Sequence, residues 1–233
     1  MSSKVYLIPT FLDEEAIHSI PSYILDAVKN CHVFFVENER TARRFLKKIW
    51  KEMVIDNYEW HVITNETGPI GAFRQKIKEG KTIGIISEAG CPGVADPGQE
   101  LVGIAHEMNA DVKPLVGPNS ILLALMASGM NGQQFQFVGY LPVKEQERTK
   151  AIRELESESQ EKNCTQIFIE TPYRNNQLIE SILKTCKPST KFCIAVDLTS
   201  SNESIHTMKI DQWKKNKPDI HKRPAIFLLY AGN

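Results

Sequence analysis

Several common signatures are missing from this sequence of 233 residues. It contains no run of about 18 consecutive apolar residues, which is the length that would predict a transmembrane helix. The apolar run from Val5 to Ile8 is too short for the hydrophobic region of a signal peptide. No Gly-x-Gly-x-x-Gly motif follows a predicted strand, which disfavours a Rossmann-type nucleotide enzyme. We therefore expect a soluble protein that is located in the cytoplasm.

Paired cysteines are also missing. The chain has five cysteines, with no Cys-x-x-Cys pair and no histidine at the spacing of zinc ligands. An odd and scattered set predicts free thiols in a reducing compartment, and no metal site. The five are Cys31, Cys91, Cys164, Cys186 and Cys193.

What the chain does contain is an alternation of short apolar runs and longer amphipathic stretches. The runs are apolar on consecutive residues, as strands buried on both faces are. They lie at 5–8, 33–36, 82–86, 112–115, 166–169, 193–196 and 225–230. Helices are predicted at 21–29, 39–52, 70–79, 99–108, 120–128, 144–162 and 175–183. This pattern predicts an α/β fold.

A domain boundary is predicted where glycine and proline follow the strand 112–115. Gly117 and Pro118 stand between that strand and the apolar helix that begins at Ser120. We therefore place an N-terminal α/β domain at residues 1–116 and a C-terminal α/β domain at residues 117–233.

The densest cluster of glycine and proline lies at Ser87–Gly98 (SEAGCPGVADPG), directly after a predicted strand. Three glycines and two prolines in twelve residues let the backbone approach a ligand closely. The carboxyl end of a strand is also where ligands bind in open α/β sheets. An ordinary strand-to-helix loop stays possible, with Asp96 as a turn former or helix cap.

The sequence of this loop resembles the SDAGTPxxSDPG loop of the ribosomal RNA small subunit methyltransferase I family. That family is a branch of the tetrapyrrole methylase superfamily, and it methylates a cytidine ribose 2′-hydroxyl. Five further segments occur in the same order. Residues 36–41 (VENERT) look like AEDTR, 116–120 (VGPNS) like PGPSA, 137–142 (FVGYLP) like FxGFLP, 168–174 (FIETPYR) like FYESPHR, and 197–199 (DLT) like ELT.

The resemblance implies a two-domain α/β enzyme with S-adenosylmethionine in a cleft between the domains, usually as a homodimer, and a role in rRNA processing with ribosomal RNA as the substrate. The residues that it assigns to the cofactor are Pro9, Ser87, Ala89, Gly90, Cys91 and Val94 in the first domain, and Asn119, Ser120, Glu170, Thr171, Leu198, Thr199 and Ala225 in the second.

The catalytic group is not fixed by these motifs. A ribose hydroxyl is a weak nucleophile, so its methylation benefits from a base, or from a cation that stabilises the developing alkoxide. Glu37 and Glu88 follow predicted strands and Arg40 lies nearby, so these three are the candidates. Cys91 has no basic partner near it in sequence and is expected to line the pocket rather than to react.

Any binding of RNA must come from a local patch, because 28 Lys and Arg balance 28 Asp and Glu. A predicted helix carries five cations at helical spacing on one face, and we assign three of them, Arg40, Arg43 and Arg44, to the substrate together with Arg174. The alternative is a solvated helix face. The other two cations of the face are Lys47 and Lys48. A second basic cluster runs from Lys214 to Arg223 and includes Lys222, and we interpret it as a polar loop.

Segment 9–15 departs from the family pattern. The family has PTPIGNL, whereas this chain has PTFLDEE, which loses the glycine and asparagine and gains three carboxylates. Tyr173 also stands where the family's ESPHR segment has histidine. Because the loop after the first strand shapes the substrate side, two alternatives stay open: a methyltransferase that acts on a small, tetrapyrrole-like molecule, and a non-catalytic S-adenosylmethionine-binding protein.

Overall fold

The computed structural model describes residues 3–63 and 68–232. It divides the chain into two compact units, Met1–Asn119 and Ser120–Asn233. The sequence-based boundary was drawn after Val116, so Gly117, Pro118 and Asn119 belong to the first unit instead of the second.

The first unit is built on a parallel five-stranded sheet in the order β3-β2-β4-β1-β5. Strands β2 and β4 are buried along their whole length because helices cover both faces of the sheet. Since all strands run in the same direction, their carboxyl ends meet at one edge. The strands are β1 (Lys4–Ile8), β2 (Val33–Val36), β3 (Glu59–Val62), β4 (Ile83–Ile86) and β5 (Asp111–Pro114).

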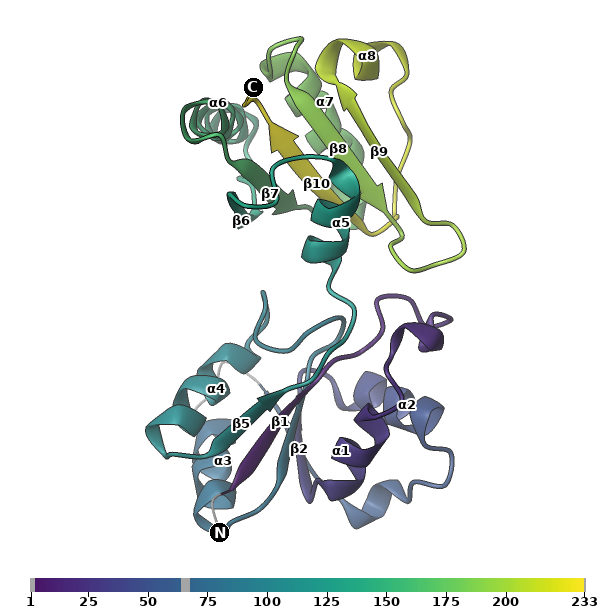
Figure 1. Cartoon of the computed structure of the whole chain (residues 1–233), viewed down its shortest axis with the longest axis vertical. Coiled ribbons are helices and arrows are strands. Elements are labelled where there is room, and N and C mark those ends of the chain that lie inside the picture. Colours follow the sequence, from purple (N-terminus) through teal and green to yellow (C-terminus); the bar gives the residue numbers. More distant parts are fainter. Residues whose placement is uncertain (1–2, 64–67, 233) are drawn as a thin grey trace. The chain divides into compact units, whose positions relative to one another are not determined.

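Helices cover both faces of this sheet (Figure 1). Consecutive residues of β2 point to opposite faces, so Phe34 packs with Phe45 in one buried cluster and Phe35 packs with Phe73 in the other. The first cluster lies under α1 (Ile24–Asn30) and α2 (Glu39–Ile49), and the second under α3 (Gly68–Lys78) and α4 (Gly98–Glu107). The 3-10 turns Ile17–Ser19 and Ile55–Asn57 complete the unit.

The second unit has a mixed five-stranded sheet in the order β6-β7-β10-β8-β9. Strand β10 is antiparallel to both neighbours, and β9 is antiparallel to β8. The carboxyl ends of β6, β7 and β8 therefore share one edge with the amino ends of β9 and β10. The strands are β6 (Phe135–Tyr140), β7 (Thr165–Ile169), β8 (Lys191–Val196), β9 (Ser204–Lys209) and β10 (Ala225–Tyr230).

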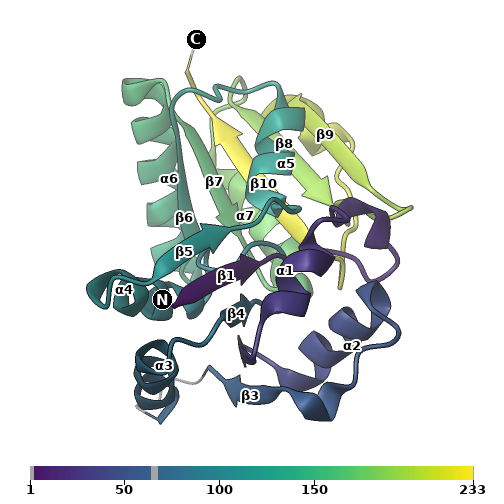
Figure 2. The same cartoon turned by 60° about the horizontal axis from the view of Figure 1, so that its bottom comes forward.

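Three helices cover one face of the second sheet, and α5 (Ser120–Ser128) crosses the other face over β10 and β9 (Figure 2). The three are α6 (Glu145–Lys162), α7 (Asn175–Thr185) and α8 (Ile210–Lys215), and the 3-10 turn η3 (Pro172–Arg174) precedes α7. Although α5 is strongly apolar, it has only nine residues. Among the residues described here, none of the helices is long and apolar enough to cross a membrane.

All seven predicted strands are present, and in the part of the chain that the structure describes three further strands were missed in the sequence. The missed strands β3, β6 and β9 are all edge strands with partly exposed side chains. The interpretation of the basic cluster as a polar loop was wrong in part, because Lys214 and Lys215 lie in α8. The five cysteines are free thiols.

Candidate functional site

The loop Ser87–Gly98 lies at the carboxyl edge of the first sheet and is tied to the end of β1. The backbone N–H of Thr10 donates to the carbonyl oxygen of Gly90 at 2.9 Å, which forms an isolated antiparallel bridge. The hydroxyl of Ser87 donates to the same carbonyl at 3.2 Å. These bonds place the glycine-rich loop directly beside segment 11–15, which departs from the family pattern.

Glycine is required at three positions in these loops. Gly90 and Gly93 have φ angles of +76° and +82°, in the left-handed region that favours glycine. Gly117, after β5, packs so tightly on Pro9 that an added Cβ would lie 2.2 Å from the proline Cβ. The loops after β1, β4 and β5 therefore make one continuous surface, which contains most of the first-domain residues assigned to the cofactor.

Asp96 organises the turn into α4. Its Oδ1 accepts the backbone N–H of Gly93 at 2.9 Å and that of Gly98, the first residue of α4, at 2.7 Å. Burial raises the pKa of Asp96, and the two N–H donors act in the opposite direction. These contacts confirm the interpretation of Asp96 as a turn former at the start of a helix.

Glu37 and Glu88 have different roles in the structure. A carboxylate oxygen of Glu37 accepts the backbone N–H of Glu88, so Glu37 holds the start of the glycine-rich loop. Burial raises the pKa of Glu37, and the negative charges of Asp96 and Glu88 raise it further, whereas the Glu88 N–H lowers it. The side chain of Glu88 is exposed.

A cavity of about 300 Å³ opens beside this loop. The segment after β1, helix α2 and the loop after β4 form its walls, at the edge where parallel α/β sheets bind ligands. Of the three catalytic candidates, Glu88 lines the cavity, whereas Glu37 and Arg40 are not among its lining residues. The cavity is lined by Thr10, Phe11, Leu12, Glu14, Thr41, Arg44, Phe45, Ser87, Glu88 and Ala89.

The acidic segment after β1 pairs with the basic face of α2. Arg44 Nη1 lies 2.6 Å from Glu14 Oε1, and Lys48 donates to the backbone carbonyl of Glu14 at 2.6 Å. Lys48 also lies 3.5 Å from Glu15 Oε1. Sequence reasoning missed these partners, because the acidic segment and the helix lie about 30 residues apart and no short motif links them.

Two more cations of the face have partners of their own. Arg43 pairs with Glu39 one turn earlier in α2, and Lys47 donates to the carbonyl of Met53 at 3.0 Å. Arg40 is exposed, and its side chain has no hydrogen bond or ion pair within residues 3–63 and 68–232. Helix α2 therefore presents one unpaired cation, because the other four are engaged by the protein itself.

In the second unit, the loop after β7 is held by a buried ion pair. Glu170 Oε1 accepts from Arg174 Nη2 at 2.6 Å and from the backbone N–H of Thr171 at 2.6 Å, and the Glu170 side chain is 2% exposed. Arg174, which the sequence assigned to the substrate, is therefore bound to a residue assigned to the cofactor.

The loop after β8 carries Leu198 and Thr199 at the same edge. Asp197 accepts from Arg223 Nε at 2.7 Å, and both Asp197 and Thr199 have left-handed φ angles, +49° and +71°. Leu198 is buried. The hydroxyl oxygen of Thr199 is buried and has no hydrogen-bond partner among the described residues. A hydrogen bond from a ligand would satisfy it.

Cys91 shows no sign of reactivity. Its thiol donates to the carbonyl of Pro118 at 3.5 Å, and burial raises its pKa, which the hydrogen bond with Asn119 partly offsets. A thiol with a raised pKa is a poor nucleophile at neutral pH. In the described part of the chain, no three His, Cys, Asp or Glu residues are grouped as metal ligands are.

Comparison with known proteins agrees with the resemblance found in the sequence. The family model described as Tetrapyrrole (Corrin/Porphyrin) Methylases matches residues 23–213. Ribosomal RNA small subunit methyltransferase I of Escherichia coli O157:H7 is 30% identical over 168 residues, which are 71% of this chain and 57% of that protein. The protein of the same name from Buchnera aphidicola subsp. Schizaphis graminum is 26% identical over 231 residues, which are 98% of this chain and 78% of its own.

Solved structures show the same fold. The crystal structure of the methyltransferase CobJ matches with a TM-score of 0.61 at 15% identity, over 98% of this chain and 93% of that one. At this identity the match concerns the fold alone, and it confirms the predicted α/β architecture.

Proposed function

This chain belongs to the tetrapyrrole methylase family and is a methyltransferase, and we propose that it transfers the methyl group of S-adenosylmethionine to a ribose 2′-hydroxyl of ribosomal RNA. The observation that carries the proposal is the cavity of about 300 Å³ beside the glycine-rich loop, at the carboxyl edge of the first sheet. The names of the two relatives support RNA as the acceptor.

The residues assigned to S-adenosylmethionine fit a ligand of this kind. In the first unit, Gly90 and Gly93 give the loop two left-handed positions without side chains, a feature that lets a backbone pass close to a ligand. In the second unit, the buried hydroxyl oxygen of Thr199 lacks a partner among the residues described, and the backbone around it is in the left-handed region. Such conformations are concentrated at ligand sites.

Glu88 is the side chain best placed to accept a proton from the acceptor. S-adenosylmethionine supplies an activated methyl group on its sulfonium. Glu88, on the cavity wall, would accept the proton that the ribose hydroxyl gives up when it takes this methyl group. Glu37 fixes the backbone of Glu88, and Arg44 on the cavity wall would lie near the ribose and its phosphate.

Calorimetric titration with S-adenosylmethionine tests the cofactor assignment. We expect saturable binding by the wild-type chain. The Gly90→Val variant should bind at least about tenfold more weakly than wild type, because a β-branched residue is strained at the left-handed φ of Gly90 and would fill the loop. Gly103→Ala is the control, since an added Cβ there has no neighbour within 4 Å. Absence of wild-type binding at millimolar cofactor would refute the assignment.

Transfer of a labelled methyl group to small ribosomal subunits from a strain that lacks the gene tests the acceptor. We expect label in RNA, and a loss of about 10²-fold or more in rate for Glu88→Gln, the size expected for a general base. Glu100→Gln, an exposed carboxylate in the first turn of α4, should keep the wild-type rate. If RNA stays unlabelled and a porphyrin acceptor becomes labelled, the small-molecule alternative replaces this proposal.

The homodimer and the cytoplasmic location expected from the sequence belong to the same proposal. Light scattering of the purified chain tests the first, since a dimer has twice the monomer mass of 26.4 kDa. Fractionation of cells tests the second.

A further inference from the structure

An exposed aromatic ring lies just after Glu170 and Thr171, at the carboxyl edge of the second sheet. Tyr173, in η3, is 70% exposed, which is the largest fraction of any Phe, Tyr or Trp in the described residues. The ammonium of Lys222 lies 5.7 Å from the centre of its ring. The ring of His221 lies 6.1 Å away and meets it at 78°. Two loops therefore bring an aromatic face, an ammonium and an imidazole together.

The backbone that carries Lys222 is held in an unfavourable conformation. Lys222 has φ +63°, in the left-handed region that residues other than glycine rarely adopt. Its N–H donates to the carbonyl of Pro172 at 3.0 Å, so the loop before β10 is bonded directly to the turn that carries Tyr173. Conformations of this kind persist where the surroundings enforce them, and they are concentrated at functional sites.

Both loops are also fixed to the start of α7. The buried side chain of Asn175 donates to the carbonyl of Arg223 at 2.7 Å, and Asn176 Oδ1 accepts the N–H of Ile220 at 3.1 Å. Asn176 also donates to Asp219 at 2.8 Å. Because the backbone is anchored on both sides of Lys222, Tyr173 and Lys222 project from a rigid base.

The charges at this surface differ from those of α2. In the region that the structure describes, Lys222 makes no ion pair, whereas its neighbour Arg223 pairs with Asp197. The nearby carboxylate of Asp219 accepts from Asn176 and from the backbone N–H of His221. The exposed ammonium of Lys222 can therefore pair with a phosphate while the ring of Tyr173 stacks on a base.

We propose that Tyr173 and Lys222 form a platform for one nucleotide of single-stranded RNA, with the base stacked on Tyr173 and the phosphate paired with Lys222. This inference rests on the proposed RNA acceptor. Aromatic rings stack on any base, and a neighbouring cation binds the backbone, so the pair fits an unpaired nucleotide of an RNA substrate.

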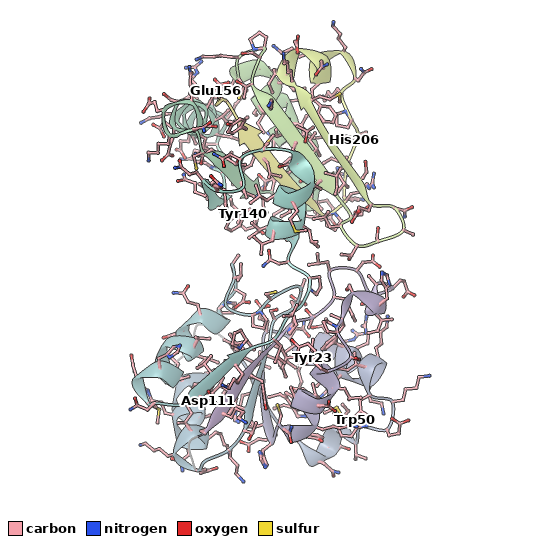
Figure 3. All side chains as sticks on the ribbon, viewed as in Figure 1. Tyr23, Trp50, Asp111, Tyr140, Glu156 and His206 are labelled. Carbon is pink, nitrogen blue, oxygen red and sulfur yellow. The ribbon has the colours of Figure 1, made fainter. Side chains whose placement is uncertain are left out.

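Fluorescence anisotropy with a short fluorescein-labelled single-stranded RNA tests the platform. Loss of one stacked base weakens binding by about 5- to 150-fold, so we expect a change of that size for Tyr173→Ala and little change for Tyr173→Phe, which keeps the ring. Lys222→Ala should weaken binding less and reduce the salt dependence by about one ion. Tyr140→Ala is the matched control, since Tyr140 is 60% exposed on β6 (Figure 3) and has no cation over its ring among the described residues.

The possible results separate this inference from the proposed function. If the wild-type chain methylates RNA and Tyr173→Ala binds the labelled RNA as tightly as wild type, the platform is wrong and the function stands. If the wild-type chain binds no RNA and labels none, both fail. A fall in the affinity of Tyr173→Ala for a porphyrin, with unchanged affinity for RNA, would also overturn the platform. Binding of S-adenosylmethionine by Tyr173→Ala should equal that of wild type, which shows that the loop is folded.

Discussion

The loops at the carboxyl edges of the two sheets are held by different forces. In the first unit they pack closely, with Gly117 against Pro9 and with backbone bonds between Thr10 and Gly90. In the second unit they are held by ion pairs, between Glu170 and Arg174 and between Asp197 and Arg223. The first set of loops therefore depends on close packing in addition to charged groups such as Glu37, whereas ion pairs hold the second set.

This difference determines which substitutions each unit tolerates. Where a loop is fixed by close packing, one added methyl group is enough to displace it. Where it is fixed by a buried carboxylate, removal of the matching cation leaves a charge that water cannot reach. The left-handed residues Asp197 and Thr199 in the second unit are not glycines, so their conformation depends on those ion pairs and on neighbouring bonds.

The largest effect is expected for Arg174→Ala, which leaves Glu170 buried without its partner. The pair is buried on the glutamate side and about a third exposed on the arginine side, so we expect a loss of about 2–4 kcal/mol in the free energy of unfolding, somewhat below the range for fully buried pairs. Urea denaturation followed by circular dichroism measures it. Arg153→Ala, at an exposed site of α6, should change stability by less than about 0.5 kcal/mol. Equal effects of the two variants would show that charge does not hold the loop.

The next effect is expected for Gly117→Ala in the first unit. The added Cβ would lie 2.2 Å from Pro9, so we expect a destabilisation of about 1–3 kcal/mol, as for other overpacked sites. Gly103→Ala in the interior of α4 should have the opposite sign and stabilise by about 0.5–1 kcal/mol, because alanine favours a helix. Thermal unfolding measures both variants, and a stabilised Gly117→Ala chain would contradict close packing.

A smaller effect on stability is expected for Glu14→Gln, because the pair with Arg44 is exposed. The unfolding free energy should fall by less than about 1 kcal/mol, whereas Arg44 becomes available to phosphate. Affinity for RNA should rise, and the slope of log affinity against log salt should steepen by about one. Glu52→Gln makes the same change in net charge outside the cavity lining. If the two variants bind RNA equally, Glu14 does not screen Arg44.

The smallest effect is expected for Glu88→Gln on the titration of Glu37. The negative charge of Glu88 raises the pKa of Glu37, while its backbone N–H, which the substitution keeps, lowers it. The pKa of Glu37 should therefore fall, and carbon-13 NMR of the carboxyl group measures it.

Because folding raises the pKa of Glu37, this residue contributes stability that is full below its unfolded pKa and is lost as pH rises through the folded value. Glu100→Gln should leave the titration unchanged, and a rise in Glu88→Gln would contradict the proposed geometry.

The fold could be predicted wherever a strand is buried on both faces. The all-buried strands β2 and β4 were found because their residues are continuously apolar. The edge strands β3, β6 and β9 were missed because one side meets solvent and polar residues interrupt the pattern. Their strand conformation comes from hydrogen bonds to a neighbouring strand, which no local pattern records.

The site was only partly predictable. The glycine-rich loop, Asp96 and the role of glycine at a strand end followed from local sequence. The partners of the basic helix did not, because Glu14 and Arg44 are brought together by the fold. The platform of Tyr173 and Lys222 was missed for the same reason, since its two residues lie on loops that precede α7 and β10.

By itself, the sequence determined the α/β pattern, the glycine-rich loop and the resemblance to a methylase family, because each of these depends on residues that are close in the chain. The tertiary structure decided which charges are free. It paired four cations of α2 within the protein and left Lys222 without an ion pair in the described residues, with its ammonium over the exposed ring of Tyr173. Pairing depends on distances of a few ångströms between residues far apart in sequence, and only the folded chain sets those distances.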